Sequence, residues 1–234
     1  MATGVVMRFD VVTLFPQMFA PFLTLGVSGR AFQGRLAVAE FWNPRDYCRD
    51  KHRTVDDRPF GGGGGMVLKP APLAAALRAA QNEKKSAKII YLTPRGALFD
   101  DAKARAMALT DGCILLCGRY RGVDERVVDA LVDEEMSVGD YVLSGGELAA
   151  MALMDAVLRH RPGVLGNSSS ADDDSFADGL LDEPCYTRPA VFEGRTVPRT
   201  LLSGNHEAIL RWRRRRSLII TARRRPDLIK KNIS

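Results

Sequence analysis

The sequence predicts an α/β fold with a largely parallel sheet, because short apolar runs, glycine turns and amphipathic helices follow one another along the chain. The clearest case lies near the middle. Ile114–Cys117 is a run of four apolar residues that ends at Gly118, as in strands buried on both faces of a parallel sheet. A helix is predicted over Asp124–Val132, whose apolar residues recur every three to four positions. In open α/β sheets, the loop after such a strand is where ligands bind.

Two strands and one helix are predicted for the first 42 residues. Arg8–Phe15 alternates in the manner of a strand, and Pro16 stops it because proline cannot donate to a strand ladder. Gln17–Leu25 is predicted as a short helix. Leu36–Trp42 is predicted as the second strand.

The stretch Asn43–Gly65 is long, charged and ends in five consecutive glycines. Loops of more than about 15 residues in a compact domain are usually functional or disordered. The glycines suggest a phosphate-binding loop, but no Gly-Lys-Ser/Thr follows them, so the P-loop interpretation fails. A flexible lid over a ligand and plain disorder both remain open.

A third strand and its helix follow. Ala71–Gln81 is an amphipathic helix, and Lys88–Thr93 is a strand that ends at Pro94-Arg95-Gly96. Phe99–Leu109 is the next helix, with alanines that suit close packing on a sheet.

Three loops are therefore predicted to form one ligand pocket: 91–96, 118–122 and 138–146. In the last loop, Gly145-Gly146 allows close approach of backbone to a ligand, and Glu147 opens another helix. None of the three is a Rossmann fingerprint, and glycine turns are often ordinary turns. The pattern alone indicates a nucleotide-like ligand.

Positive charge is concentrated at the C-terminal end. The net charge is +6, but residues 195–234 hold twelve Lys/Arg against Glu207 and Asp227, a net of +10, which leaves −4 for residues 1–194. Arginines flank Trp212 and Leu218–Ile220, which indicates a basic helix with an apolar side. A solvated helix face is one interpretation. The concentration of charge in a small segment favours a polyanion, namely the backbone of RNA or DNA.

Length and composition predict one large domain and a small one, since 234 residues with 46% hydrophobic content can bury a full core. No run of 18 apolar residues occurs, and Arg8 and Asp10 interrupt the start too early for a secretion signal. We therefore expect a soluble, cytoplasmic protein with no membrane partner.

The four cysteines lack the spacing of a zinc site. Cys113 and Cys117 would lie about 13 Å apart on one strand, beyond the reach of a disulfide. We expect reduced thiols in the core.

Seven strings together resemble a known family. They are HRTVDDRP (52–59), YLTPRG (91–96), CGRY (117–120), GVDER (122–126), SVGDYVLSGGE (137–147), DSF (174–176) and LSGNH (202–206). In this order they are similar to the bacterial tRNA (guanine-N1)-methyltransferases, TrmD. The likeness covers nearly the whole chain, and the 137–147 string is long enough to be highly specific.

The resemblance implies a SPOUT-type parallel sheet with a deep trefoil knot, an obligate homodimer and S-adenosylmethionine as methyl donor. It implies a knotted cofactor-binding domain over 1–165, a flexible linker over 166–180 and a small basic helical tRNA-binding domain over 181–234. The general rule against knots would exclude this topology from the pattern alone.

The resemblance also implies the cofactor residues, which come from the three predicted loops. They are Tyr91, Leu92, Pro94, Gly96, Gly118, Tyr120, Val138, Gly139, Tyr141, Leu143, Gly145 and Gly146. Adenine needs flat apolar walls and backbone donors and acceptors, and glycine turns expose such backbone. Tyr141 and Leu143 could instead belong to the core.

Asp174 and Arg159 take the catalytic roles in the resemblance. Guanine N1–H is a poor nucleophile, so a base must remove the proton, and a cation near O6 favours the anionic ring. Taken alone, Asp174 would be a solvated linker aspartate, because 166–179 is rich in Ser, Asp and Gly. The resemblance makes it a carboxylate delivered into the partner subunit's pocket when tRNA binds.

Some positions depart from the family pattern. Arg121 stands where a glutamate is usual, Arg95 replaces a common glutamine, and the glycine run lacks a proline. A magnesium requirement is implied only by the resemblance, since no metal-ligand cluster is visible in the sequence.

The implied function is methylation of the guanine just 3′ of the anticodon, position 37 of tRNA. Two alternatives are a SPOUT enzyme with another target nucleotide and a non-catalytic RNA-binding homologue. The presence of both Asp174 and Arg159 disfavours the second, because a binding protein needs no base.

Overall fold

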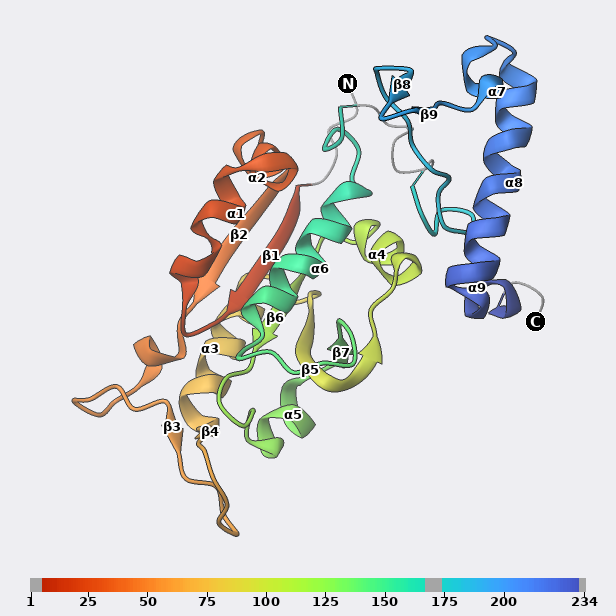
Figure 1. Cartoon of the computed structure of the whole chain (residues 1–234). Coiled ribbons are helices and arrows are strands. Elements are labelled where there is room, and N and C mark those ends of the chain that lie inside the picture. Colours follow the sequence, from red (N-terminus) through yellow and green to blue (C-terminus); the bar gives the residue numbers. More distant parts are fainter. Residues whose placement is uncertain (1–5, 167–173, 232–234) are drawn as a thin grey trace. The chain divides into compact units, whose positions relative to one another are not determined.

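The computed structural model describes residues 6–166 and 174–231. The chain divides into two compact units, residues 1–166 and residues 167–234 (Figure 1). Among the described residues, none of the helices combines the length and apolar character that a membrane crossing requires.

The first unit is built on a five-stranded sheet in the order β2-β1-β6-β5-β7. Its strands are β1 Met7–Val12, β2 Ala37–Trp42, β5 Lys88–Leu98, β6 Gly112–Cys117 and β7 Glu134–Ser137. Every neighbouring pair is parallel, so the predicted parallel sheet is confirmed. The central strands β1 and β6 are almost wholly buried, because helices cover both faces of the sheet.

Helices lie on the two faces of this sheet (Figure 1). Their bounds are η1 Pro16–Phe19, α1 Ala20–Thr24, α2 Gly26–Gln33, η2 Pro44–Tyr47, α3 Pro70–Glu83, α4 Asp101–Ala108, α5 Glu125–Leu131 and α6 Glu147–Arg159. On one face, α2, α4 and α6 share a core with Phe9 and Leu115. On the other, α3 and α5 pack over Ile89 and Ile114. Successive side chains of each strand point to opposite faces of the sheet, so β1, β5 and β6 contribute residues to both cores.

Local signals set the starts of the helices. Asp100 caps α4 by accepting from Lys103 N at 3.0 Å, and Asp124 caps α5 by accepting from Arg126 N at 3.0 Å. Pro70 opens α3, at a position where its missing N–H costs nothing. These helices therefore begin within two residues of their predicted starts.

Three elements, β5, β7 and α2, differ from the prediction. β5 continues past Thr93 to Leu98, because the chain pairs with β7 again after an irregularity between Leu92 and Ala97. β7 and α2 were also not predicted: β7 has the short, charged sequence EEMS, whereas α2, GVSGRAFQ, does have a helical apolar period that the prediction missed.

The long stretch before α3 contains more structure than a plain loop. After η2, β3 Asp56–Asp57 pairs antiparallel with β4 Val67–Leu68. Leu68 also forms a parallel bridge with Val123. The glycine run therefore lies in a hairpin whose base is anchored next to the start of α5.

The second unit contains β8 Val191–Phe192, β9 Arg195–Thr196, α7 Arg199–Leu202, α8 His206–Arg224 and α9 Pro226–Lys231. Asn205 caps α8 by accepting from Ala208 N at 3.0 Å. The chain before β8 packs along α8, where Leu181 N donates to Thr221 Oγ1 at 2.9 Å. This unit buries few side chains, among them Leu180 and Thr221.

The buried cysteines follow the prediction. Cys113 and Cys117 are free and buried in β6. Burial raises the pKa of the Cys113 thiol to about 12, so this side chain is a neutral core residue.

Candidate functional site

A pocket of about 370 Å³ lies where β5, β6 and β7 lead into their loops. This volume is in the usual range of sites for small molecules, roughly 300–1,000 Å³. Eleven of the twelve residues predicted for cofactor binding line it: Tyr91, Leu92, Pro94, Gly118, Tyr120, Val138, Gly139, Tyr141, Leu143, Gly145 and Gly146. The structure therefore brings the three predicted loops together around one cavity.

Two of these loops are joined directly. Gly146 N donates to Gly118 O at 2.9 Å, and Arg119 and Gly145 form an antiparallel bridge. A Cβ at Gly146 would lie 2.7 Å from Cys117 Cα, which is backbone that cannot move aside. The glycine is needed for this close approach, and it leaves main-chain groups at the pocket wall.

The backbone is strained beside this junction. Tyr120 has a φ of +60°, a conformation that costs a non-glycine residue about 1–3 kcal/mol. Hydrogen bonds hold it from both sides, because Gly122 N donates to Arg119 O at 3.1 Å and Arg121 N donates to Met66 O at 2.9 Å. Strain of this kind is typical of ligand-binding positions.

The third loop turns sharply after β7. Ser137 Oγ lies 3.1 Å from Gly139 O and 3.2 Å from Gly139 N, so the hydroxyl can bond to both groups. Gly139 has a φ of +148°, which favours glycine there. Leu143 is half-buried and packs against the core while lining the pocket, whereas Tyr141 is exposed. Leu143 therefore belongs in part to the core, and its contact with the cofactor stays a prediction.

A buried ion pair supports the pocket from behind. Glu147 is 1% exposed in its side chain and Arg119 is 17% exposed, and Arg119 Nε lies 2.9 Å from Glu147 Oε2. Glu147 Oε1 accepts from Thr13 Oγ1 at 2.8 Å and from Arg119 Nε at 3.1 Å. The Arg119 guanidinium also lies over the Phe15 ring, 4.4 Å from its centroid. These contacts connect the end of β1 to both glycine loops.

Replacing Arg119 with methionine is expected to lower the free energy of unfolding by about 3 kcal/mol, because Glu147 would remain buried without its cation. Urea denaturation would measure this loss. Arg126→Met is the matched control, since Arg126 pairs with Asp124 at 2.7 Å but is 70% exposed, and it should change stability far less. Equal effects of the two substitutions would contradict a structural role for the buried pair.

Burial is the main cause of the pKa shifts of two groups in β5 and β6. Burial raises the pKa of the Tyr91 phenol, and burial together with the nearby Glu147 carboxylate raises the pKa of the Cys117 thiol well above its ordinary value. Both groups are therefore neutral near pH 7. A protonated, buried thiol is a poor nucleophile and a poor metal ligand.

Gly96 is the predicted cofactor residue that is not among the pocket-lining residues. A Cβ added to Gly96 would lie 2.2 Å from Met136 N, so this glycine allows β5 to pass close to β7.

Two residues that support the site, Arg119 and Thr13, were not predicted from the sequence. Arg119 could have been predicted, because it follows Gly118 in the motif. Thr13 could not, because it is 134 residues from Glu147 in the sequence.

Neither of the two predicted catalytic residues lines the pocket. Arg159 is the last residue of α6, and Ala149 is the last residue of that helix to line the pocket. Ten residues of helix place them about 15 Å apart along the axis, at 1.5 Å per residue. Asp174 is exposed in the second unit. The structure thus keeps Arg159 away from the pocket of its own chain.

Within 6–166 and 174–231, no cluster of three or more His, Cys, Asp or Glu side chains is placed to hold a metal ion.

Comparison with known proteins identifies the family. The family model for tRNA (guanine-1)-methyltransferase TrmD matches residues 7–231. A tRNA (guanine-N(1)-)-methyltransferase of Janthinobacterium sp. (strain Marseille) is 54% identical over 230 residues, which is 96% of this chain and 92% of the relative. The enzymes so named from Pasteurella multocida (strain Pm70) and Psychromonas ingrahamii (strain DSM 17664 / CCUG 51855 / 37) are 54% and 55% identical, over 95% of this chain and 91% and 92% of theirs. The chain belongs to the tRNA (guanine-1)-methyltransferase family, TrmD.

Proposed function

We propose that this protein is an S-adenosylmethionine-dependent methyltransferase that acts on N1 of the guanine just 3′ of the anticodon, position 37 of tRNA. The observation that carries the proposal is the pocket, because eleven residues of three family motifs line one cavity. The match of the family model to residues 7–231 supports the same reaction.

The lining residues fit the proposed cofactor. Leu92, Val138 and Leu143 offer apolar walls for adenine. Gly118 and Gly146 bring main chain to the pocket wall, where groups not used in their mutual hydrogen bond can bond to the edge of the base or to the ribose. When bound, S-adenosylmethionine would supply a methyl group on a positively charged sulfur.

The side chains of the protein have two tasks in the proposed reaction. The Asp174 carboxylate accepts the N1 proton of guanine, and the Arg159 guanidinium stabilises the negative charge that develops toward O6. With S-adenosylmethionine bound, the products would be N1-methylguanine and S-adenosylhomocysteine, and Asp174 would hold the N1 proton until solvent removes it.

Mapping the methylated base tests the proposal directly. Purified protein would be incubated with unmodified tRNA and labelled cofactor, and the modified nucleotide located by mass spectrometry. Methylation at N1 of the guanine 3′ of the anticodon is the expected result. A different methylated nucleotide would indicate a SPOUT enzyme with another target. Binding of tRNA without methylation would indicate a non-catalytic homologue.

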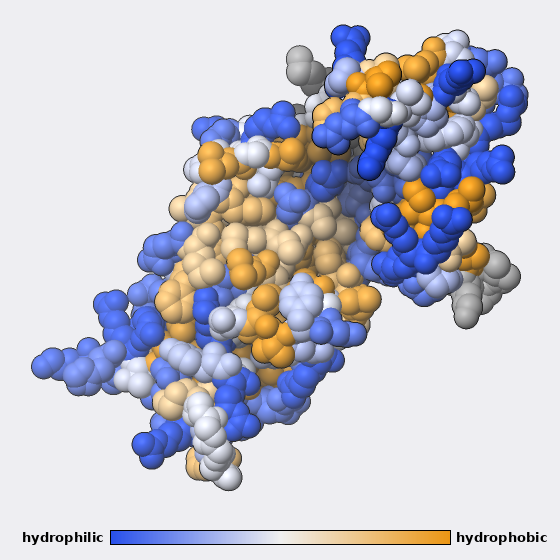
Figure 2. Space-filling model, in the orientation of Figure 1, coloured by the Kyte–Doolittle hydropathy of each residue, from blue (hydrophilic) through white to orange (hydrophobic). Residues whose placement is uncertain are grey.

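The proposal includes the trefoil knot and the homodimer of the family. The hydrogen bond from Gly146 N to Gly118 O holds loops 118–122 and 138–146 together, as a knot at this place would require. Figure 2 shows apolar residues gathered on the face of the first unit that α6 crosses in Figure 1. Phe15, Met18 and Leu148 are exposed, and η1, which contains Met18, packs against α6, which contains Leu148. A second copy of the chain would cover such a face.

The domain division given in the sequence analysis stays a prediction. We propose that 1–165 binds the cofactor, that 166–180 is a flexible linker, of which 167–173 lie outside the described residues, and that 181–234 is a small helical domain that binds tRNA. A tRNA substrate would place the enzyme in the cytoplasm. Magnesium stays a family implication, and the proposed chemistry assigns no step to it.

The arginines of α8 differ in their partners, which sharpens the prediction for tRNA binding. Arg213 lies 3.1 Å from Glu183, and Arg211 and Arg214 pair with Glu207 and Asp178. In contrast, Arg215, Arg223 and Arg224 have no carboxylate partner within the described part of the chain.

We expect the triple variant Arg215→Gln, Arg223→Gln and Arg224→Gln to bind tRNA more weakly. The slope of log K against log salt should fall by about 2–3, because each phosphate contact contributes roughly 0.7–0.9. Filter binding at several salt concentrations would measure it. The control is the triple variant Arg211→Gln, Arg213→Gln and Arg214→Gln, for which the salt slope should change less because these arginines are paired with carboxylates. If cofactor affinity fell as much as tRNA affinity, this helix would be structural.

A further inference from the structure

Three arginines line the pocket, and they differ in how their charge is used. Arg95 lies 3.0 Å from Glu125 and 3.4 Å from Glu135, and Arg119 is paired with Glu147. Arg121 has no carboxylate within 4 Å among the described residues. Its guanidinium is therefore the uncompensated positive charge at this pocket.

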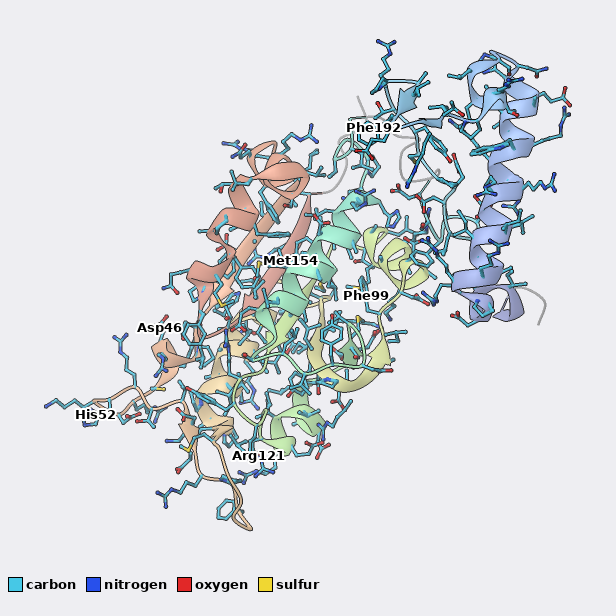
Figure 3. All side chains as sticks on the ribbon, in the orientation of Figure 1. Asp46, His52, Phe99, Arg121, Met154 and Phe192 are labelled. Atoms are coloured by element: carbon cyan, nitrogen blue, oxygen red, sulfur yellow. The ribbon has the colours of Figure 1, made fainter. Side chains whose placement is uncertain are left out.

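Arg121 is held in place by the hairpin that carries the glycine run. Its backbone N donates to Met66 O at 2.9 Å, and one terminal nitrogen donates to Gly64 O at 3.2 Å. Gly122 and Asp124 bond to Leu68 on the same side, since Leu68 N donates to Gly122 O at 3.0 Å and Asp124 N donates to Leu68 O at 3.2 Å. Figure 3 shows Arg121 beside this hairpin.

The glycines leave the space that the Arg121 side chain fills. A Cβ at Gly65 would lie 2.8 Å from Arg121 Cγ, and a Cβ at Gly63 would lie 2.7 Å from a terminal nitrogen. Both glycines have positive φ, +84° and +95°. The absence of side chains in the glycine run therefore lets Arg121 lie against the backbone, where the bond to Gly64 O orients its guanidinium.

We propose that Arg121 binds a phosphodiester group of the RNA substrate at the mouth of the pocket, with the glycine hairpin positioning its guanidinium. This inference rests on the proposed function. One bond to Gly64 O leaves further N–H groups of the guanidinium for an anion, and their fork geometry matches phosphate oxygens. Arg121 is exposed and lies against an exposed segment, where a long polyanion has access.

Charge substitution tests the anion contact. We expect Arg121→Gln to weaken tRNA binding about tenfold and to reduce the salt slope by roughly 0.7–0.9, the loss of one phosphate contact. Arg121→Glu should weaken binding further, because it repels the phosphate. Arg126→Gln is the matched control, since Arg126 lies four residues from the end of the same loop, pairs with Asp124 and does not line the pocket. Its tRNA affinity should stay within about twofold.

A second pair of variants separates the position of the guanidinium from its charge. Gly62 and Gly65 both have positive φ, but a Cβ at Gly62 meets nothing within 4 Å. Both alanine variants therefore carry a similar backbone cost, and only Gly65→Ala displaces Arg121. We expect Gly65→Ala to weaken tRNA binding several-fold and Gly62→Ala to leave it nearly unchanged.

Measurements of cofactor affinity distinguish an RNA phosphate from the cofactor carboxylate as the anion that Arg121 binds. Cofactor affinity, measured by calorimetry with S-adenosylhomocysteine, should stay within about twofold in Arg121→Gln. Loss of cofactor affinity with unchanged tRNA binding would overturn the proposal and assign Arg121 to the cofactor carboxylate. Unchanged affinity for both ligands would overturn it as well. If the wild type methylates tRNA and Arg121→Gln binds tRNA with wild-type affinity, this inference fails and the proposed function stands.

Discussion

Asp174→Asn is expected to lower the single-turnover rate of methylation by at least about two orders of magnitude, because general-base catalysis typically contributes 10² to 10⁴ in rate. Asparagine keeps the size and much of the hydrogen bonding of aspartate but cannot accept a full proton at neutral pH. The step that removes the N1 proton should therefore suffer. Affinities for cofactor and tRNA should stay within a few-fold.

Rapid-quench measurements with enzyme in excess over tRNA would isolate this step from product release. Asp172→Asn and Asp173→Asn are the matched controls, since these aspartates share the same acidic stretch of sequence and lie outside the described residues. A solvated linker would make all three substitutions behave alike. Near-normal turnover of Asp174→Asn, or equal damage from Asp172→Asn, would remove Asp174 from the role of base.

Much of the first unit could be predicted because local and global preferences agree there. The apolar run Ile114–Cys117 is buried on both faces, so composition alone marks it as an inner strand. Asp124 and the glycine pair 145–146 mark the starts of α5 and α6, because capping and close backbone approach demand particular residue types. The three loops of the pocket follow from the order of these elements.

Other features could not be read from sequence because they depend on contacts between distant segments. β7 is short and charged, and only its pairing with β5 makes it a strand. The support of Glu147 by Thr13 joins the N-terminal strand to the start of α6. The place of Arg121 against the glycine run is likewise a tertiary contact. The sequence pattern alone did not decide whether the glycine run forms a lid or is disordered.

The position of Arg159 has a consequence for how the enzyme would be assembled. α6 begins at the pocket and carries Arg159 to its far end, about 15 Å beyond Ala149 by helical rise. An arginine side chain does not span that distance. If Arg159 stabilises the reacting guanine, it acts at the pocket of another chain, which is consistent with the proposed homodimer. Sedimentation of the wild type should then show a dimer at micromolar concentration.

Mixing two inactive variants should restore activity. Leu143→Arg places a charged side chain into the pocket, which should abolish cofactor binding, and Arg159→Gln removes the proposed cation. In a shared-site dimer, a mixed pair joins the intact pocket of one chain to the intact Arg159 of the other. Random exchange of subunits in equal amounts should then return about a quarter of the wild-type activity, because half of the dimers are mixed and each has one complete site.

The choice of partners makes this test specific. Asp174→Asn should also complement Leu143→Arg, because it leaves the pocket intact. Asp174→Asn mixed with Arg159→Gln should stay inactive, since both residues would serve the partner's pocket from the same chain and each mixed site would lack one of them. Each variant must first show wild-type circular dichroism and a dimeric mass. Recovery to about a quarter of the wild-type activity in the last mixture, or none in the first two, would contradict a catalytic site built from the pocket of one chain and the Arg159 and Asp174 of its partner.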